Sequence, residues 1–377
     1  MLNLIDVINC GAAFLLAFII FINTNKVNSK ANQWFGVFVF CFFLLLLENV
    51  LLFTKTLKEN NIVIEIISIS TFVISPIFYL SVSYFVDPIK KWKTTYFLHF
   101  FFAFLMLTLI LIAHFFEQEL KPEKVNPETV AYTTLLFNLI FSLQVIPYCL
   151  LAFVKINKHQ KNIQSLHSTI EDIDLKWLKN IIIGVFIIAI FWVGDIVFKL
   201  SDTNSIFDIA SSLIYLLGIL YITYYWLKQK EIFPYNIFEK EEIKTIITET
   251  TFNENNNKKL LTDERQEFLQ LRLLEVMNKD KPFLNSELSL VKLAELLNIT
   301  PHILSYLINK GFNQNFYQFI NHYRVEEAKK LIIDPKIAHL SLLGIAFEVG
   351  FNSKTVFNTS FKKITGQTPS EFKRQKG

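Results

Sequence analysis

Long hydrophobic runs, interrupted by few charged residues, fill the first 228 positions of the chain. Each run reaches or approaches the roughly 20 residues with which an α-helix crosses the hydrocarbon core of a bilayer. Helices are expected because an open sheet or a loop would leave backbone groups unpaired in lipid. The runs cover residues 4–22, 34–53, 62–85, 96–116, 131–154, 178–198 and 206–227. The pattern therefore predicts a bundle of seven transmembrane helices.

Shorter hydrophobic patterns follow in the C-terminal part of the chain, where one helical plan occurs twice. In the first copy, residues 290–297 read LVKLAELL, with the small Ala294 where two helices would cross and Asn298 four positions later. In the second copy, residues 342–349 read LLGIAFEV and place Ala346 and Gly350 at the same spacing. Asn and Gly tolerate the positive φ that a tight turn requires. Two helices joined in this way predict a helix-turn-helix unit.

The second helix of each copy has an apolar face and a polar face. Thr300 is expected to cap the first of these helices, with Pro301 at its first position, and Ser353 is expected to cap the second. Ile303 or Leu304, together with Leu307, Ile308, Phe357 and Phe361, are expected to face the core. The outward residues are His302, Ser305, Tyr306 and Asn309 in the first copy and Lys354, Thr355, Asn358, Thr359 and Lys362 in the second.

The remaining segments define three regions. A central helix is expected over 316–333, between the two copies, and Asp334-Pro335 ends it. Residues 229–281 are charged and Asn-rich, which is typical of a linker, with a helix near 262–278 that Thr262 can cap. That helix, with Phe268, Leu271, Leu274 and Met277 at helical spacing, either packs on the next domain or serves dimerisation or signalling. The predicted organisation is all-α, with a membrane region at 1–228, the linker at 229–281 and a DNA-binding domain at 282–377.

Lysine positions predict the orientation of the bundle. Loops one, three and five, and the end of the last run, are richer in lysine than the alternate loops, and positive charge tends to stay in the cytoplasm. The lysines are Lys26, Lys30, Lys90, Lys91, Lys93, Lys155, Lys158, Lys161, Lys176, Lys179, Lys228 and Lys230. The expected location is the cytoplasmic (inner) membrane, multi-pass, with the N-terminus outside and the C-terminal domain in the cytoplasm.

Composition argues against an ordinary soluble enzyme. Of the 377 residues, 52% are hydrophobic, 19% are charged and 39 are Phe. The common nucleophile, zinc-protease, phosphate-loop and dinucleotide motifs are missing, and Cys10, Cys41 and Cys149 all fall inside hydrophobic runs. We therefore expect no catalytic residues, no metal and no cofactor.

Ionisable residues inside the hydrophobic runs are costly in lipid and so need an explanation. With the orientation above, Asp6, Glu48, Glu65, His114, Asp195 and Asp208 all fall toward the outer ends of their helices. Two interpretations stay open: the side chains reach the outer interface, or Glu48, Glu65, Asp195 and Asp208 line an outward pocket for a small signal. Pro76 and Pro147 are candidate kinks that would let such a bundle change shape.

The C-terminal residues resemble a known family. LVKLAELLNITPHILSYLIN, INHYRVEEAKKLI and LLGIAFEVGFNSKTVFNTSFKKITGQTPSEFKR are similar to the AraC/XylS-type DNA-binding domain, over about a quarter of the chain. The whole chain resembles a bacterial architecture in which a seven-span region precedes this domain. The resemblance implies two helix-turn-helix units that enter successive major-groove segments, with His302, Ser305 and Tyr306 reading in the first and Lys354, Thr355, Asn358 and Thr359 in the second. Tyr306 and Thr359 stand where many members have Arg, the best reader of guanine.

Charge agrees with DNA as the partner. Residues 282–377 hold twelve Lys and Arg against seven Asp and Glu, a net charge of +5. Phosphate contacts are expected from the basic side chains of Lys310, Arg324, Lys362, Lys363, Lys373 and Arg374. The expected DNA-binding set is His302, Ser305, Tyr306, Asn309, Arg324, Lys354, Thr355, Asn358, Thr359, Lys362 and Lys363.

The sequence therefore predicts a membrane-bound one-component transcriptional regulator. Its expected partners are double-stranded DNA, membrane lipid and an unknown small-molecule or envelope signal, and coupling through a homodimer or through docking of the 262–278 helix stays open. One alternative is a transporter or membrane receptor whose basic tail is a protein-interaction module. Another is a membrane anchor that senses nothing.

Overall fold

The computed structural model describes residues 2–22, 28–57, 61–87, 91–117, 127–198, 205–229, 260–337 and 339–376. They divide into two compact units, each of which is described by itself below. Unit 1 comprises Met1–Asn157 and Leu175–Ile232, and unit 2 comprises Lys158–Asp174 and Phe233–Gly377. The Asn-rich part of the predicted linker lies outside the described residues.

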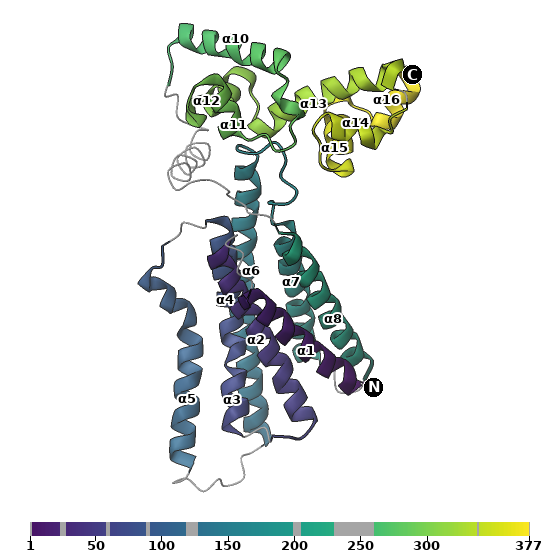
Figure 1. Cartoon of the computed structure of the whole chain (residues 1–377). Helices are drawn as coiled ribbons and strands as arrows, with labels where there is room; N and C mark the ends of the chain where they lie inside the picture. The colour runs from purple at the N-terminus through teal and green to yellow at the C-terminus, as the bar shows by residue number, and fades with distance from the viewer. Residues whose placement is uncertain are drawn as a thin grey trace. The chain divides into compact units, whose positions relative to one another are not determined.

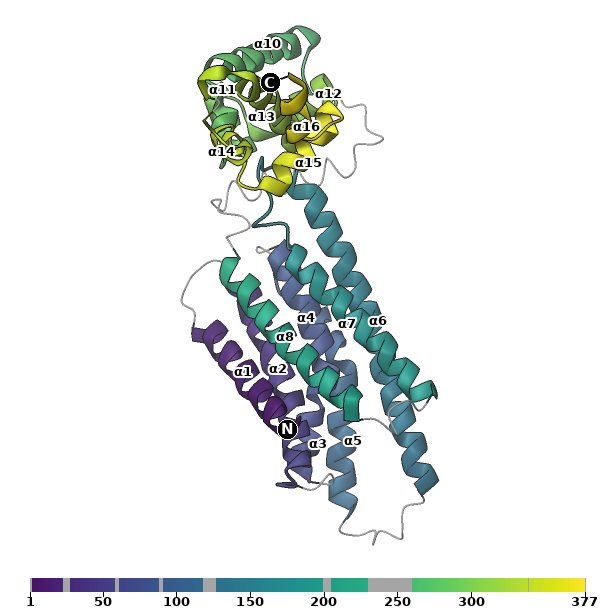
Figure 2. The ribbon, with the colours of Figure 1, turned by 90° about the vertical axis from the view of Figure 1, so that its right-hand side faces the viewer.

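Unit 1 is a bundle of long apolar helices, which Figures 1 and 2 show running alongside one another. Its helices are α1 (Leu2–Ile22), α2 (Ser29–Phe53), α3 (Ile62–Ser68), α4 (Ser70–Val86), η1 (Thr94–Phe100), α5 (Phe101–Glu117), α6 (Pro127–Ile163), α7 (Lys176–Phe198) and α8 (Ser205–Lys228). Each of the seven hydrophobic runs lies on these helices. Within the described residues, four stretches are long and apolar enough to cross a membrane, namely Leu4–Ile22, Ser29–Phe53, Ile62–Val86 and Thr94–Ile112.

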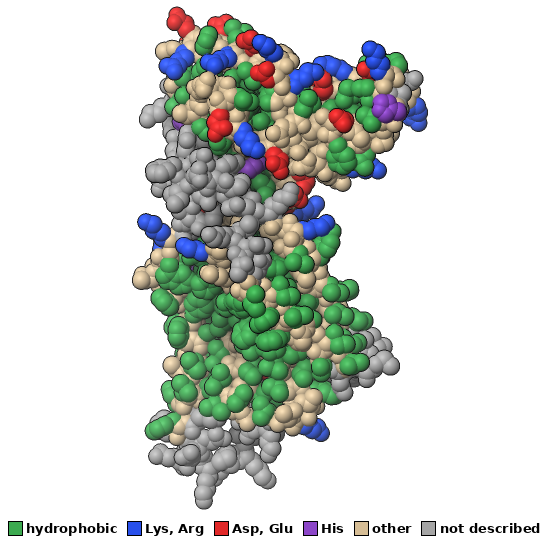
Figure 3. Space-filling model, in the orientation of Figure 1, with side chains coloured by type: hydrophobic (Ala, Val, Ile, Leu, Met, Phe, Trp, Pro, Cys, Tyr) green, Lys and Arg blue, Asp and Glu red, His purple; other side chains and the backbone are tan. Residues whose placement is uncertain are grey.

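Apolar side chains cover the outside of unit 1, and several polar side chains lie inside it. Leu98, Phe115 and Leu143 are 73%, 75% and 70% exposed, whereas Asn9 and Gln144 are buried. Figure 3 shows the hydrophobic side chains over the face of unit 1 that is in view. Water would penalise such a surface, because monomeric soluble proteins rarely expose large contiguous apolar patches.

The two candidate kink prolines lie inside helices, as predicted. Pro76 lies within α4 and Pro147 within α6. Proline lacks the N–H that would bond the carbonyl four residues earlier, which for Pro76 is Phe72. That carbonyl instead accepts a hydrogen bond of 2.7 Å from the buried Gln144 side chain of α6. The third run has one interruption, at Ile69 between α3 and α4.

Unit 2 is helical as well. Its helices are α10 (Asp263–Lys279), η3 (Pro282–Leu284), α11 (Leu290–Leu297), α12 (Pro301–Phe312), α13 (Phe316–Ile333), η4 (Pro335–Ile337), α14 (Leu342–Glu348), α15 (Lys354–Thr365) and α16 (Pro369–Lys376). The central helix has the bounds that the sequence predicts. The pair α11–α12 and the group α14–α16 both pack on α13, which connects them in Figure 1.

The helix α10 packs against α11 and α12, in agreement with the first of the two interpretations of that segment. Its buried face differs from the predicted one, because Leu269, Leu273 and Met277 are buried, whereas Phe268 and Leu271 are exposed. Thr262 precedes the helix, as predicted, but its side chain makes no capping hydrogen bond. The neighbours of α10, rather than its most hydrophobic stripe, determine which side is buried.

Candidate nucleic-acid interface

The first helix-turn-helix unit forms as its local signals predict. Ser289 Oγ accepts a hydrogen bond from Lys292 N at 3.3 Å and caps α11. Asn298 ends that helix with a φ of 54°. Thr300 Oγ1 accepts from Ile303 N at 3.3 Å and caps α12. These contacts fix the angle at which α12 leaves α11.

The two faces of α12 agree with the prediction at most positions. Leu304, Leu307 and Ile308 are buried, while His302, Tyr306 and Asn309 are partly exposed. Ser305 was predicted to face outward, but it is only 6% exposed, and its hydroxyl lies 3.3 Å from Asn309 Nδ2. Ser305 is therefore not available for base contact in this structure. The reason is its spacing: it lies next to Leu304 and three residues before Ile308, on the edge of the buried face.

The second helix-turn-helix unit forms around an aromatic core. Gly350 has a φ of 92°, as the turn requires, and Ser341 Oγ caps α14 by accepting from Gly344 N at 3.0 Å. Phe357 and Phe361 of α15 are buried with ring centroids 5.7 Å apart. Ser353 precedes α15, but its side chain makes no capping hydrogen bond. The aromatic core, rather than a cap, holds the start of α15.

The polar face of α15 is open to solvent. The exposed side chains are Lys354, Thr355, Thr359, Lys362 and Lys363, and Asn358 is partly exposed. The Thr359 hydroxyl donates to Thr355 O at 2.8 Å, so its free capacity toward DNA is as an acceptor. A helix with lysines, an amide and hydroxyls on one side has the donors and acceptors that base edges and phosphates need.

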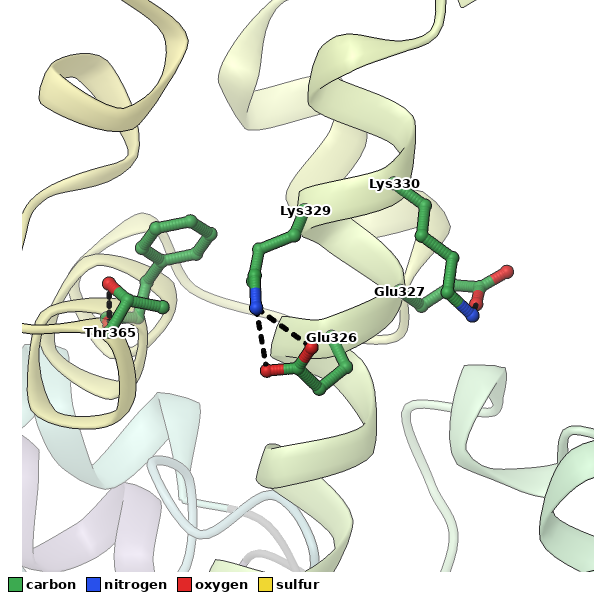
Figure 4. A network of polar contacts seen from close by, with 6 residues as sticks. Glu326, Glu327, Lys329, Lys330 and Thr365 are labelled. Atoms are coloured by element: carbon green, nitrogen blue, oxygen red, sulfur yellow. Dashed lines mark hydrogen bonds and ion pairs between the residues drawn. The ribbon is translucent and has the colours of Figure 1, made fainter. Parts of the chain in front are cut away.

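Two lysines of α13 form ion pairs with carboxylates of the same helix. Lys329 Nζ lies 2.8 Å from a Glu326 oxygen, and Lys330 Nζ lies 3.0 Å from a Glu327 oxygen. Figure 4 shows both pairs on α13. Glu327 also forms an ion pair with Lys281, and these pairs hold the pKa of its carboxyl below its usual value although burial opposes this. Lys354, Lys362 and Lys363 of α15 and Lys373, Arg374 and Lys376 of α16 are further basic residues of this domain, and Lys310 lies on α12.

Arg324 is a correction to the predicted DNA-binding set. Its side chain is 0% exposed and donates to carbonyl oxygens inside unit 2. A buried guanidinium with these partners cannot contact DNA, so the prediction is wrong in this structure. The sequence contains a signal that predicts burial, because Arg324 lies four residues after Ile320 and four before Ala328, both of which are buried.

The candidate signal pocket of unit 1 is described only in part. Glu48 accepts a hydrogen bond from Ser68, and Glu65 lies on α3, the helix that Ser68 ends. Asp195 and Asp208 lie on α7 and α8, but their side chains are outside the described residues. The four-residue pocket therefore stays a prediction.

A second polar contact in unit 1 joins α1 to α8. Ser212 Oγ donates to Asp6 at 2.6 Å, and the Asn9 amide donates to Ser212 O at 2.8 Å. Asp6 was expected near the outer end of its helix, and here it finds a partner on a neighbouring helix. This contact, rather than solvent alone, accommodates its carboxylate.

Known proteins resemble the C-terminal region of the chain. A family described as "Helix-turn-helix domain" matches residues 293–375. The HTH-type transcriptional regulator YijO of Escherichia coli (strain K12) is 34% identical over 90 residues, which are 24% of this chain and 31% of that protein. The transcriptional regulatory protein YesN of Bacillus subtilis (strain 168) is 38% identical over 85 residues, 22% of each chain. The chain thus spans less than a third of the length of these two curated relatives.

A solved structure also aligns with part of the chain. It is the C-terminal domain of AraT, a response regulator from Geobacillus stearothermophilus, with 28% identity and a TM-score of 0.26 over 31% of this chain and 88% of that one. The family match covers α12 to α15, most of α16 and the last five residues of α11, so it includes both helices that are predicted to read DNA. Residues 293–375 are an AraC-type helix-turn-helix domain, the kind of domain that transcriptional regulators carry.

Proposed function

We propose that this protein is a membrane-bound, one-component transcriptional regulator that reads DNA with α12 and α15 and responds through its seven-helix region to an unknown signal. The observation that carries the proposal is the presence, in one chain, of an AraC-type double helix-turn-helix domain and a bundle whose outer surface is apolar. A single chain with both parts needs no separate sensor protein.

The faces of the reading helices support DNA as the partner. The polar sides of α12 and α15 offer His302, Tyr306, Lys354, Asn358 and Lys362 to solvent. Lysines near phosphates release counterions and provide affinity that does not depend on sequence, and Asn358 can read a base edge. Sequence-specific binding through both units follows from this division of roles.

The membrane assignment rests on length and surface. Helices coincide with all seven hydrophobic runs, so we infer seven crossings, with the N-terminus outside and the C-terminus in the cytoplasm. Unit 2 supports this topology, because it contains both the C-terminal domain and the Lys158–Asp174 segment that follows the fifth run. Two regions of one compact unit lie on the same side of a membrane, so α7 and α8 between them must cross it an even number of times. Two crossings agree with the lysine distribution.

The DNA-binding part of the proposal can be tested by genome-wide footprinting in cells. The full chain is compared with a Lys354→Ala, Asn358→Ala and Lys362→Ala triple variant, and with a Lys330→Ala, Lys336→Ala control that removes the same positive charge from other surfaces. We expect the triple variant to lose its footprints, because each such contact contributes about 1–3 kcal/mol, while the control retains them. Indistinguishable profiles for the full chain and the triple variant would refute DNA reading by α15.

The topology and the sensing role have separate tests. An alkaline phosphatase fused after the last residue should be inactive, since that enzyme folds only outside the cytoplasm; activity would overturn the inside location. Exchange of the membrane helices in 1–157 and 175–228 for those of an unrelated seven-span anchor, with residues 158–174 retained, should abolish regulation of the footprinted genes. Unchanged regulation would show that the membrane region only anchors the domain.

A further inference from the structure

A segment between two predicted membrane helices is part of the DNA-binding unit. The chain leaves α6 at Ile163 and enters α7 at Lys176, and Lys158–Asp174 belongs to unit 2. His167 forms an antiparallel bridge with Ser289, the residue that caps α11. Next to this bridge, a short run of backbone pairing holds the segment against the start of the first helix-turn-helix unit, as Leu290 N donates to Leu166 O at 2.8 Å.

Side chains strengthen this contact. Ser168 Oγ donates to Leu288 O at 2.7 Å, and Thr169 Oγ1 donates to Ser286 O at 2.8 Å. At the other end of the first unit, Gln164 O accepts from Tyr317 N at 2.9 Å, in the first turn of α13. The segment therefore contacts the residues before α11 and the first turn of α13.

Arg324 joins the same segment to the core of the DNA-binding unit. Its Nη1 donates to Ser168 O at 3.1 Å, and its Nη2 lies 3.0 Å from Ser168 Oγ. Its Nε donates to Phe283 O at 2.8 Å, and its Nη2 also donates to Asn285 O at 2.9 Å. Burial lowers the pKa of Arg324 to about 10, which Glu171 and Tyr317 oppose, so the side chain is still a cation at neutral pH. A buried cation depends strongly on each of its acceptors.

The other side of Arg324 meets the second helix-turn-helix unit. The turn residue Gly350 packs so closely that an added Cβ would lie 2.6 Å from Phe283 O and 3.0 Å from Arg324 Nε. The Phe351 ring centroid is 5.7 Å from Arg324 Cζ. One side chain thus touches the segment after α6, the residues before α11 and the turn that orients α15.

We propose that Arg324 is a positioning residue that sets the placement of the two helix-turn-helix units relative to each other, and that the 164–171 segment is the element through which α6 and α7 change that placement. The inference rests on the proposed function and names its route of regulation. A segment tied to both α6 and α7 moves when these helices move. Loss of the Ser168 and Thr169 hydroxyls removes one acceptor from each of the two terminal nitrogens of Arg324, Nη2 and Nη1. The spacing of α12 and α15 on DNA then depends on a contact that lies on neither reading face.

A distance measurement tests this in the full chain, reconstituted in lipid nanodiscs. Cys10, Cys41 and Cys149 are replaced by alanine, and spin labels are placed at the exposed positions 310 on α12 and 362 on α15. The test variant is Ser168→Ala with Thr169→Val. Its matched control is Ser165→Ala, which changes a serine of the same segment whose side chain has no hydrogen bond among the described residues. We expect the test variant to shift or broaden the distance between the labels by about 2 Å or more, the scale of helix shifts in switching proteins, and the control to match the parent.

A second label pair and a conservative variant separate positioning from unfolding. Labels at positions 295 and 310 report on the first helix-turn-helix unit alone, and the distance between them should not change. If it does change, Thr169→Val replaces the double variant. Thr169→Ser, which retains the hydroxyl, is then its control. Affinity for footprinted DNA, measured on the same variants with Lys310 and Lys362 unchanged, should fall about tenfold in the test variant, as expected for the loss of a charged hydrogen bond. Equal distances between positions 310 and 362 in the parent and the test variant would overturn the inference. If no variant retained DNA, the proposed function would fail, while the distances would still decide the positioning role.

Discussion

Units 1 and 2 differ in the kind of side chain that covers their surfaces. In unit 1, Phe104 and Leu109 are about half exposed, while the polar Asn9 and Gln144 are buried. In unit 2, phenylalanines such as Phe361 are buried and lysines cover the surface. The difference indicates the solvent that each unit requires, because lipid accepts apolar side chains on the outside and leaves polar groups to pair within the bundle. Unit 2 also buries polar side chains, and among them Arg324 is a buried cation that contacts the 164–171 segment.

The largest expected effect is a contrast between two phenylalanines. Phe361→Ala should lower the free energy of unfolding of unit 2 by about 3–5 kcal/mol, because it empties a buried site between Phe357 and Phe372. Phe104→Ala, at a position 56% exposed on α5, should change the stability of unit 1 by about 0.5 kcal/mol or less in lipid. Denaturant titration of the full chain in nanodiscs, with hydrogen exchange assigned to each unit, measures both. Similar losses of stability at the two sites would contradict the proposed difference between the surfaces of the two units.

A charge substitution sharpens the comparison from the other side. Leu109→Arg, at a position 49% exposed near the middle of α5, should oppose membrane insertion by about 2.5–3.5 kcal/mol. Ile333→Arg, at a position 50% exposed at the end of α13, should change stability by about 0.5 kcal/mol or less. Glycosylation acceptor sites placed on both sides of α5 report the inserted fraction for the first variant, and thermal unfolding reports the second. Normal insertion of Leu109→Arg would mean that this face of α5 does not meet lipid.

A smaller effect is expected from pH, within unit 2. Burial lowers the pKa of His159 to about 4, although a hydrogen bond with Ile173 opposes this. Burial, followed by His159 and Lys292, lowers the pKa of His167 to about 4. Both folded-state pKa values lie below the ordinary value of 6.5. The contribution of these histidines to the stability of unit 2 is therefore fully present above pH 6.5 and is lost as the pH falls toward 4. At pH 5 the loss should be on the order of 2 kcal/mol per histidine.

The measurement is denaturant unfolding of the full chain between pH 7.5 and 5, with a His167→Gln variant that removes one titrating group. The variant should show a shallower pH dependence than the parent. His322→Gln serves as the control, since that side chain is exposed. Equal slopes for the parent and His167→Gln would contradict the lowered pKa of His167.

Several features of the fold and the candidate site follow from local rules. The positive φ of Asn298 and Gly350, the bounds of α13 and the inward side of α15 depend on residues within one or two helical turns, and all were predicted. The predicted exposure of Ser305 was wrong because this residue lies at the edge of the buried face of α12, where the width of the helix contact determines exposure. The predicted buried side of α10 was wrong because the neighbouring helices pack on Leu269 and Leu273 and not on the more hydrophobic stripe.

The sequence by itself determined which segments are helical, which are long and apolar enough for a bilayer, and which polar side chains of α15 face outward. These properties depend on hydrophobic period, length and turn residues, which are local. Only the tertiary structure decided the role of Arg324 and the place of the 164–171 segment. Arg324 and Ser168 are 156 positions apart, and their hydrogen bonds exist because separate helices bring a buried cation and its acceptors together. No spacing rule along the chain predicts this contact, since it depends on how α13 packs and where α6 ends.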